Sequence, residues 1–386
     1  MESWKRKLRM GMVGGGQGAF IGGVHRIAAA MDGQIALTAG CFSRDYENTK
    51  QTGKDLYLDE NRLYKSYQEM AEKEASLPED ERIDFVSVVT PNVSHFPIAK
   101  VFLEAGIHVV CDKPMTYTLD EAKELVKLVE DTGLVFVLTH NYTGYPLIRE
   151  ARKLVADGAI GKVRKVVVQY LQEFLAVPQE KLGMKQAVWR TDPKQSGIGG
   201  TIGDIGTHCV NLMEFITQDP ISELLADKST FLPDRKLDED VNALFRFEGG
   251  GKGVLAISQV APGEENGLSI RIYGSEGGLS WGQENPNYME LYKIGEPPKR
   301  LGRGNGYLSD AADEVSRIPS GHPEGYLEGF ANIYNGATEL IRNYIVGKPV
   351  KPQEYIVPNV YDGLRGMQFI YSALDSCDKN SQWVSM

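Results

Sequence analysis

Short apolar runs alternate with amphipathic segments from residue 7 to about residue 140. We predict strands at the runs LRMGMVGGG, IALTAGCF, FVSVVT, HVVCDKP and LVFVLTH. We predict helices at GGVHRIAAAM, PIAKVFLEAG and LDEAKELVKLVEDTG, the last with an acidic first turn and a closing Gly133. Continuous apolar strands separated by helices indicate a parallel sheet covered on both faces, which binds ligands at the carboxyl ends of its strands.

The pattern changes after residue 140. A predicted helix, YPLIREARKLVADGAIG, is followed by the alternating segments VRKVVVQYLQ, VNALFRFEGG, GVLAISQVA, LSIRIYGSEGGLSWG and YMELYKI, which predict a mostly antiparallel sheet. Residues 295–325 are rich in Gly, Pro and charge, so we expect a long loop there. The helices YLEGFANIYNGATELIRNYIVGK and VYDGLRGMQFIYSALDS end the chain. We therefore expect one domain over residues 1–140 and a second over residues 141–386.

Composition narrows the class of protein. With 386 residues the chain is long enough for two domains, and its formal net charge of -10 argues against nucleic acid and anionic membranes as partners. No signal peptide and no apolar run of ~18 residues are evident. The four cysteines are scattered without metal-ligand spacing, so we expect no metal, reduced thiols and a cytoplasmic location.

A glycine loop, MVGGGQGAFIGGVH, follows the first predicted strand and opens the first helix. In this context glycines allow a tight turn and a close approach of the backbone to a pyrophosphate. Gly14 and Gly16 supply the first two positions of a dinucleotide fingerprint. Either Ala19 or Gly22 supplies the third, and we favour Gly22 because it starts the helix. The alternative is a glycine-rich connection that binds nothing.

The second predicted strand ends in GCFSRD. An acidic residue at this point would hold the ribose hydroxyls of NAD, whereas Ser43 and Arg44 suit the 2′-phosphate of NADP. Asp45 follows directly and is the alternative ribose ligand. The choice between NAD and NADP therefore stays open, with a preference for NADP.

The stretch VVCDKPMT delivers Lys113 to the end of a buried strand. Pro114 removes the N–H that a continuing strand would need, so the strand stops there. Because the strand belongs to the parallel sheet, Lys113 is expected to face the same ligand crevice as the glycine loop. The alternative is a solvated lysine at a strand end.

Three segments resemble one family in the same order along the chain. GIHVVCDKPMTYTLDEAKELV resembles the Glu-Lys-Pro segment of the Gfo/Idh/MocA oxidoreductase family, with Asp112 in place of the glutamate. VVTPNVSHFPIAKVFLEAGIHV and GTIGDIGTHCVNLMEF resemble its Thr-Pro-Asn-x-x-His and Gly-Asp-x-x-x-His segments. A later segment, GHPEGYLEGFANIY, resembles a subgroup associated with sugar and glycoside substrates. The matching residues are Thr90, Pro91, Asn92, His95, Lys113, Gly203, Asp204 and His208.

The resemblance implies an α/β protein with an N-terminal Rossmann dinucleotide-binding domain and a C-terminal α/β domain with a large, open-faced, mostly antiparallel sheet. It also implies NAD(P)-dependent oxidation or reduction at a sugar or polyol carbon. Such an open sheet face would expose apolar surface in a monomer, so we expect a homo-oligomer, either a dimer or a tetramer.

Asp204 and His208 lie four residues apart and therefore share one helical face. Hydride transfer from a secondary alcohol needs a base for the hydroxyl proton, and histidine titrates near neutrality. We assign His208 as proton acceptor, Asp204 as substrate ligand and modulator, and Lys113 as the group that polarises the substrate oxygen. The alternatives are an ordinary surface ion pair and a metal site with Cys209, whose position next to His208 directs it away from their face.

Other candidates carry less weight, because each also has a purely structural interpretation. Near the cofactor we expect Thr90, Asn92 and His95, which follow the strand FVSVVT. Near the substrate we expect Asn141, Tyr170, Trp189, Arg190 and His322. The alternatives are a domain linker for Asn141, the sheet core for Tyr170 and a loop histidine for His322.

The predicted function is hydride transfer between NAD(P) and a secondary alcohol or ketone of a sugar, glycoside or cyclic polyol. One alternative is a glycosidase-like enzyme that uses NAD transiently for oxidation and elimination. Another is a non-catalytic dinucleotide-binding sensor, although a sensor does not need a proton acceptor.

Overall fold

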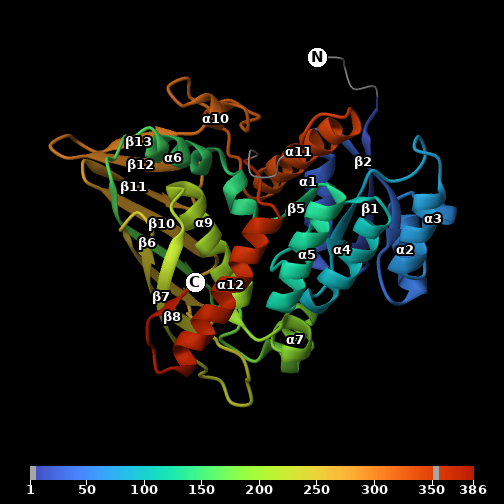
Figure 1. Ribbon diagram of the computed structural model, residues 1–386, viewed down its shortest axis with the longest axis horizontal. Helices are drawn as coiled ribbons and strands as arrows, with labels where there is room; N and C mark the ends of the chain where they lie inside the picture. Colours follow the sequence, from blue (N-terminus) through green and yellow to red (C-terminus); the bar gives the residue numbers. More distant parts are fainter. Residues whose placement is uncertain (1–5, 351–355) are drawn as a thin grey trace. The chain divides into compact units, whose positions relative to one another are not determined.

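A computed structural model describes residues 6–350 and 356–386 of the chain (Figure 1). The chain folds into two compact units. The first unit comprises Met1–His140 and Phe330–Leu364, and the second comprises Asn141–Gly329 and Arg365–Met386. The division after residue 140 coincides with the expected boundary. Residues 330–364 differ from the expectation, because they join the first unit instead of a continuous domain over residues 141–386.

The first unit contains a five-stranded sheet of order β2-β1-β3-β4-β5, with every pair parallel. Its strands are β1 (Leu8–Gly14), β2 (Ile35–Cys41), β3 (Phe85–Val89), β4 (His108–Cys111) and β5 (Phe136–Leu138). Its helices are α1 (Phe20–Ala30), α2 (Tyr46–Asp55), α3 (Tyr67–Ser76), α4 (His95–Glu104), α5 (Leu119–Thr132) and most of α11 (Tyr326–Ile345). The predicted Gly133 ends α5 in a left-handed conformation, with φ of 64°.

Helix α11 joins the first unit through a buried hydrogen-bonded cluster. The hydroxyl of Tyr334 lies 2.8 Å from Nδ1 of His25 on α1 and 2.8 Å from the hydroxyl of Ser87 on β3. All three side chains are buried, so these polar groups satisfy one another away from water. This cluster gives the physical reason why the segment after residue 330 belongs with the first sheet.

The second unit contains a nine-stranded sheet of order β13-β12-β11-β10-β6-β9-β8-β7-β14. Its strands are β6 (Val163–Leu171), β7 (Ile221–Ser229), β8 (Asp240–Phe247), β9 (Lys252–Ser258), β10 (Gly267–Gly274), β11 (Gly277–Gly282), β12 (Tyr288–Lys293), β13 (Lys299–Gly302) and β14 (Val384–Ser385). Among the described strands only β6 and β9 pair in parallel, and the other neighbours are antiparallel. The predicted α/β class with a mostly antiparallel second sheet is confirmed.

Helices cover one face of the nine-stranded sheet (Figure 1). They are α6 (Pro146–Ala156), α9 (Thr207–Thr217) and most of α12 (Val360–Asp378). The short helices α7 (Lys185–Arg190), α8 (Pro193–Ser196) and α10 (Asp310–Asp313) also belong to the second unit, where α7 packs against α8 and α10 packs against α6. The side chains on the other face are exposed to solvent. Leu244 of β8 is 44 % exposed and Tyr273 of β10 is 42 % exposed, whereas Phe245, the neighbour of Leu244 on the covered face, is buried. The alternation of buried and exposed positions is the pattern of a sheet with one solvated face.

The expected loop over residues 295–325 contains two short elements. β13 pairs with β12, and α10 packs against α6, where Glu150 accepts hydrogen bonds from the N–H and hydroxyl of Ser309. β12 and β13 are neighbours in the sequence, whereas Glu150 lies 159 residues from Ser309, so local composition did not reveal the packing of α10.

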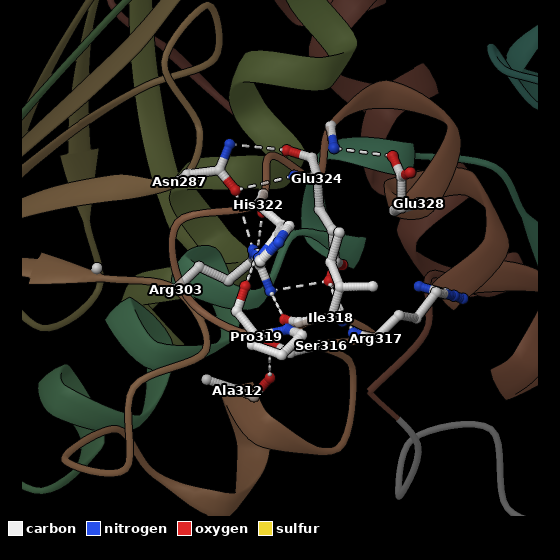
Figure 2. A network of polar contacts seen from close by, with 12 residues as sticks. Asn287, Arg303, Ala312, Ser316, Arg317, Ile318, Pro319, His322, Glu324 and Glu328 are labelled. Atoms are coloured by element: carbon white, nitrogen blue, oxygen red, sulfur yellow. Dashed lines mark hydrogen bonds and ion pairs between the residues drawn. The ribbon is translucent and has the colours of Figure 1, made fainter.

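The rest of this segment is held by a buried ion pair after β13 (Figure 2). Arg303 and Glu324 lie 2.8 Å apart, and each side chain is only 2 % exposed. Arg303 also donates to the side chain of Asn287 and to the backbone carbonyls of Ile318 and His322. The guanidinium therefore fixes the loop that leads into α11.

Candidate active site

The glycine loop joins β1 to α1 in the first unit. Gly14 and Gly15 have φ values of 88° and 74°, which side-chain-bearing residues rarely adopt. A Cβ at Gly22 would overlap the Cα of Gly15, so only glycine allows this close approach of helix and loop. Ala19, the alternative third position, precedes the helix and makes no side-chain capping bond. The backbone N–H groups at this helix end can therefore receive a pyrophosphate.

Gly16 packs the same loop against the end of β2. Its N–H donates to the carbonyl of Phe42 over 3.1 Å, and an added Cβ would overlap the side-chain oxygen of Asn48. With positive φ at Gly14 and Gly15 and glycines also at positions 16 and 18, the loop fits a dinucleotide.

Ser43, Arg44 and Asp45, which lie shortly after β2, make different contacts in the structure. The carboxylate of Asp45 accepts the N–H of Glu47 over 3.0 Å and caps α2, and the hydroxyl of Ser43 accepts the N–H of Asp45 over 3.1 Å. Arg44 is exposed and makes no hydrogen bond or ion pair with any residue that the structure describes. Its guanidinium is thus available to a phosphate, whereas the capping role already uses Asp45.

Residues after β3 form a braced turn. The two ring nitrogens of His95 lie 2.9 Å from the carbonyl oxygen of Thr90 and 2.8 Å from that of Pro114. Burial lowers the pKa of His95, so the neutral ring can donate to one of these carbonyls. This imidazole therefore braces the backbone on both sides, and its contact with the cofactor stays a prediction. Asn92 is buried nearby, and the hydroxyl of Thr90 is buried with no hydrogen-bond partner among the described residues.

Lys113 follows β4, as predicted, and is half-buried. The carboxylate of Asp112 accepts the backbone N–H of Lys113 over 2.9 Å and the hydroxyl of Thr139 over 3.0 Å. Burial lowers the pKa of His140 to about 3, and the charge of Lys113 acts in the same direction. The ammonium group is therefore close enough to His140 to disfavour a second positive charge.

In the second unit a π-helical turn, Ile202–Gly206, precedes α9 and carries Asp204. Its Oδ2 accepts hydrogen bonds from Nε of Arg190 over 3.0 Å and from Nε2 of Gln259 over 2.9 Å. π-Helical turns are rare and occur frequently at functional sites. The guanidinium charge of Arg190 favours the ionised carboxylate.

The side chains on α7 lie together beside this carboxylate. The guanidinium of Arg190 stacks over the ring of Trp189 at 4.3 Å and also donates to the side chain of Gln186 over 2.6 Å. Arg190 of the predicted pair thus forms an ion pair with Asp204, and Trp189 packs against Arg190.

His208 lies one turn further on α9 and is buried among tyrosines. Its ring meets the ring of Tyr142 edge-on at 4.8 Å and lies 6.4 Å from that of Tyr170. The two phenol oxygens are 2.6 Å apart, and Tyr170 donates to the side-chain oxygen of Asn266 over 2.7 Å. Burial raises the pKa of Tyr142 to about 12, and the charge of Asp204 contributes. Burial also raises the pKa of Tyr170, so both phenols are neutral, and Asp204 acts on both.

The remaining candidates are less clearly placed. Nδ2 of Asn141 is buried without a hydrogen-bond acceptor among the described residues, as expected for a side chain that awaits a ligand. His322 is exposed, and its described hydrogen bonds are made by its backbone, whose N–H donates to the carbonyl of Pro319 and whose carbonyl accepts from Arg303.

The predicted site residues are divided between the two units. The first holds Gly14, Gly16, Gly22, Ser43, Arg44, Thr90, Asn92, His95 and Lys113, and the second holds Asn141, Tyr170, Trp189, Arg190, Asp204, His208 and His322. The action of Lys113 with Asp204 and His208 on one substrate stays a prediction. Neither Gln259 nor Asn266 was anticipated, because nothing in their local sequence marks them.

The fold and the glycine loop define a nucleotide-binding oxidoreductase. The sequence matches the model of an oxidoreductase family with an NAD-binding Rossmann fold over residues 8–140 and the GFO/IDH/MocA C-terminal domain over residues 148–280. The chain therefore belongs to the Gfo/Idh/MocA family, and the resemblance drawn from its motifs is confirmed. The dinucleotide cofactor is confirmed with it.

Three similar proteins cover nearly the whole chain. An oxidoreductase from Sinorhizobium meliloti is 45% identical, with a TM-score of 0.87 over 98% of this chain and 100% of that one. An inositol dehydrogenase homolog complexed with NAD+ from Azotobacter vinelandii is 35% identical, with a TM-score of 0.93 over 99% and 98%. Levoglucosan dehydrogenase of Pseudarthrobacter phenanthrenivorans is 25% identical over 99% of this chain and 98% of its own.

Within the described residues no helix has the length and apolar character needed to cross a membrane. The same residues contain no group of three or more His, Cys, Asp or Glu side chains placed to hold a metal ion.

Proposed function

We propose that this protein is an NAD(P)-dependent dehydrogenase acting on a secondary alcohol or ketone of a sugar, glycoside or cyclic polyol. The observation that carries the proposal is the cluster in which Asp204 is ion-paired with Arg190 while His208 is buried against two neutral tyrosines. A carboxylate and an imidazole next to hydroxyl and amide groups suit a substrate rich in hydroxyl groups. The names of the inositol and levoglucosan dehydrogenases point to the same substrate class.

The first unit holds the cofactor. The N–H groups at the start of α1 would bind the pyrophosphate, and Thr90 and Asn92 would hold the nicotinamide riboside. Ser43 and Arg44 bind the adenosine ribose, and the unpaired guanidinium favours NADP. When bound, the cofactor would supply the hydride acceptor for the substrate carbon, or the hydride donor in the reverse direction.

The acid–base steps belong to the side chains of this chain. His208 takes the proton of the substrate hydroxyl, and in the reverse direction it returns that proton to the oxygen. Lys113 places its positive charge beside this oxygen and stabilises the alkoxide character that develops there. Asp204 accepts a hydrogen bond from a substrate hydroxyl, while Arg190 balances its charge.

Further side chains bind and orient the substrate. Trp189 offers a ring face for stacking on a sugar, and the amide of Asn141 donates the hydrogen bond that it does not make within the described protein. Tyr170 and His322 complete the polar lining in this proposal.

We also propose that the protein works as a homo-oligomer, a dimer or tetramer, because exposed side chains such as Leu244 and Tyr273 lie on the uncovered face of the nine-stranded sheet. All four cysteines lie within the described residues and are free thiols there, which suits a reducing compartment such as the cytoplasm.

Turnover of a panel of sugars and cyclic polyols with NAD+ and NADP+ tests the proposal. We expect reduced cofactor to accumulate with the wild-type protein and kcat to fall about 100-fold or more in Lys113→Met and His208→Ala. Lys123→Met, which removes an exposed lysine of α5, is the matched control and should retain full activity. Equal activity of all four proteins would contradict the assigned roles.

The same assay separates the alternatives. Release of a sugar without accumulation of reduced cofactor would indicate transient oxidation followed by elimination. Tight cofactor binding without turnover of any carbohydrate would indicate a sensor. Arg44→Ala should raise the KM for NADP+ about tenfold and leave that for NAD+ unchanged if Arg44 binds the 2′-phosphate.

A further inference from the structure

Two glutamine side chains lie side by side next to Asp204. Nε2 of Gln259 donates to Oδ2 of Asp204 over 2.9 Å and to Oε1 of Gln172 over 3.2 Å. The hydroxyl of Thr201 donates to the other end of the same amide, Oε1 of Gln259, over 3.2 Å. Gln259 is only 2 % exposed, so all of its amide bonding is to protein groups.

The unusual parallel strand pair of the second sheet creates this amide pair. β6 and β9 run in register, with Leu171 opposite Ser258, and each is followed directly by one of the glutamines. The N–H of Gln172 donates to the carbonyl of Ser258 over 2.8 Å, so the pairing continues one residue past the strands. In an antiparallel pair the two carboxyl ends would lie at opposite edges, and these residues could not meet.

The glutamines point to the face of the sheet that α9 covers. Side chains two residues apart share a face of a strand, so Gln172 follows the buried Tyr170 and Gln259 follows the buried Ile257. Helix α9 packs on β6 on this side. The amide of Gln259 thereby bridges the π-helical turn, with Thr201 before the turn and Asp204 within it.

The partners of Gln259 determine the orientation of its amide. A carboxylate can only accept hydrogen bonds when ionised, so the NH2 end must face Asp204 and the oxygen must face the hydroxyl of Thr201. The amide of Gln259 is uncharged, so it can orient the carboxylate of Asp204 without forming a second ion pair. Arg190 balances the negative charge of this carboxylate.

A second branch of the network reaches His208. Gln172 donates to the side-chain oxygen of Asn266 over 2.8 Å, and that oxygen also accepts the hydroxyl of Tyr170 over 2.7 Å. The hydroxyl of Tyr170 has one hydrogen, and it donates this hydrogen to Asn266. The hydroxyl of Tyr142 must therefore be the donor in its 2.6 Å contact with the oxygen of Tyr170. The ring of Tyr142 then meets that of His208 edge-on.

We propose that Gln259, supported by Gln172, is a positioning residue that sets the orientation of the Asp204 carboxylate relative to His208 and thereby controls substrate turnover. The catalytic part of this proposal rests on the proposed function, whereas the placement of the amide against the carboxylate does not. Its effect passes through Asp204, and Gln259 itself does not touch the reacting atoms.

Two substitutions of Gln259 test the proposal, with Gln169 as the matched control. Gln169 lies on β6 but on the opposite face of the sheet and is partly exposed. Gln259→Leu removes the donor, so kcat should fall on the order of 10- to 100-fold at every pH. Gln259→Glu places a second carboxyl group against Asp204, and the two share a proton because like charges in contact cannot both ionise.

The shared proton produces a signature that a general loss of structure does not. In Gln259→Glu the protonated carboxyl group can still donate to Asp204, so kcat should approach the wild-type value at acid pH and fall as pH rises. The infrared difference spectrum between this variant and the wild-type protein, without cofactor or substrate, should contain the C=O band of a protonated carboxyl group at neutral pH. Gln169→Glu and Gln169→Leu should show neither effect.

The outcomes are distinct. Absence of the carboxyl band, an unchanged kcat in Gln259→Leu, or equal pH profiles for Gln259→Glu and the wild-type protein would overturn the proposal. If the wild-type protein turns over no carbohydrate, the proposed function fails, but the infrared result still decides whether Gln259 faces Asp204. Thermal melting confirms folding, and the isosteric Gln259→Glu variant keeps the test decisive if Gln259→Leu does not fold.

Discussion

The buried His108 should make the stability of the first unit depend on pH. This residue starts β4 and is 4 % exposed, and its Nδ1 accepts the backbone N–H of Val135 over 3.0 Å. The ring of Tyr344 packs against it edge-on at 4.6 Å. Burial lowers the pKa of His108 to about 4, against a partly opposing charge from Asp84. Protonation would place a hydrogen on the acceptor nitrogen and a charge among apolar groups.

The sign and size of the effect follow from proton linkage. Between pH 6.5 and about 4 this histidine is protonated in the unfolded chain but neutral in the folded protein. The free energy of unfolding therefore falls as pH drops through this window and is constant above it. For one such group the free energy of unfolding should decrease by about 2 kcal/mol between pH 7.5 and pH 5. His25, with a pKa lowered by burial to about 4, adds to the total in the same direction.

Urea unfolding of His108→Gln at several pH values isolates the contribution of this side chain. The variant cannot titrate, so the loss of stability between pH 7.5 and pH 5 should be about 2 kcal/mol smaller than in the wild-type protein. His25 contributes equally to both proteins and cancels. His322→Gln, at an exposed loop position, should behave as the wild-type protein does. Parallel curves for His108→Gln and the wild-type protein would refute the reasoning.

Two further substitutions probe the glycine loop and the buried ion pair. Gly22→Ala should weaken NAD+ binding about tenfold or more in titration calorimetry. Gly23→Ala should leave the affinity unchanged, because its added methyl group would meet no atom closer than 4.0 Å. Equal affinities of the two variants for NAD+ would exclude the steric argument. Arg303→Met should lower the free energy of unfolding by ~3–5 kcal/mol because it leaves Glu324 buried and unpaired. Arg300→Met, at an exposed position, should cost less than ~0.5 kcal/mol, and similar losses for both variants would contradict the ion-pair argument.

Periodicity predicted those parts of the fold that depend on local sequence. Apolar runs located the parallel strands, and the acidic first turn with Gly133 located α5, because a capping box and a left-handed glycine are local features. The sequence did not indicate that residues 330–364 join the first unit. That outcome depends on Tyr334 meeting His25 and Ser87, which are 309 and 247 residues away.

For the site, sequence motifs predicted chemical types better than positions. The spacing of Asp204 and His208 suggested one face of an α-helix, but the turn that carries Asp204 is π-helical and packs closely, since a Cβ at Gly206 would lie 2.9 Å from Ile257. Gln259 holds this turn across the sheet. A glutamine one residue past a strand has no signature of its own, and its role depends on the strand register, which emerges only when β6 and β9 pair in parallel. The groups to which we assign the chemistry were therefore singled out by type and spacing, whereas the groups that hold them in place are defined by long-range pairing.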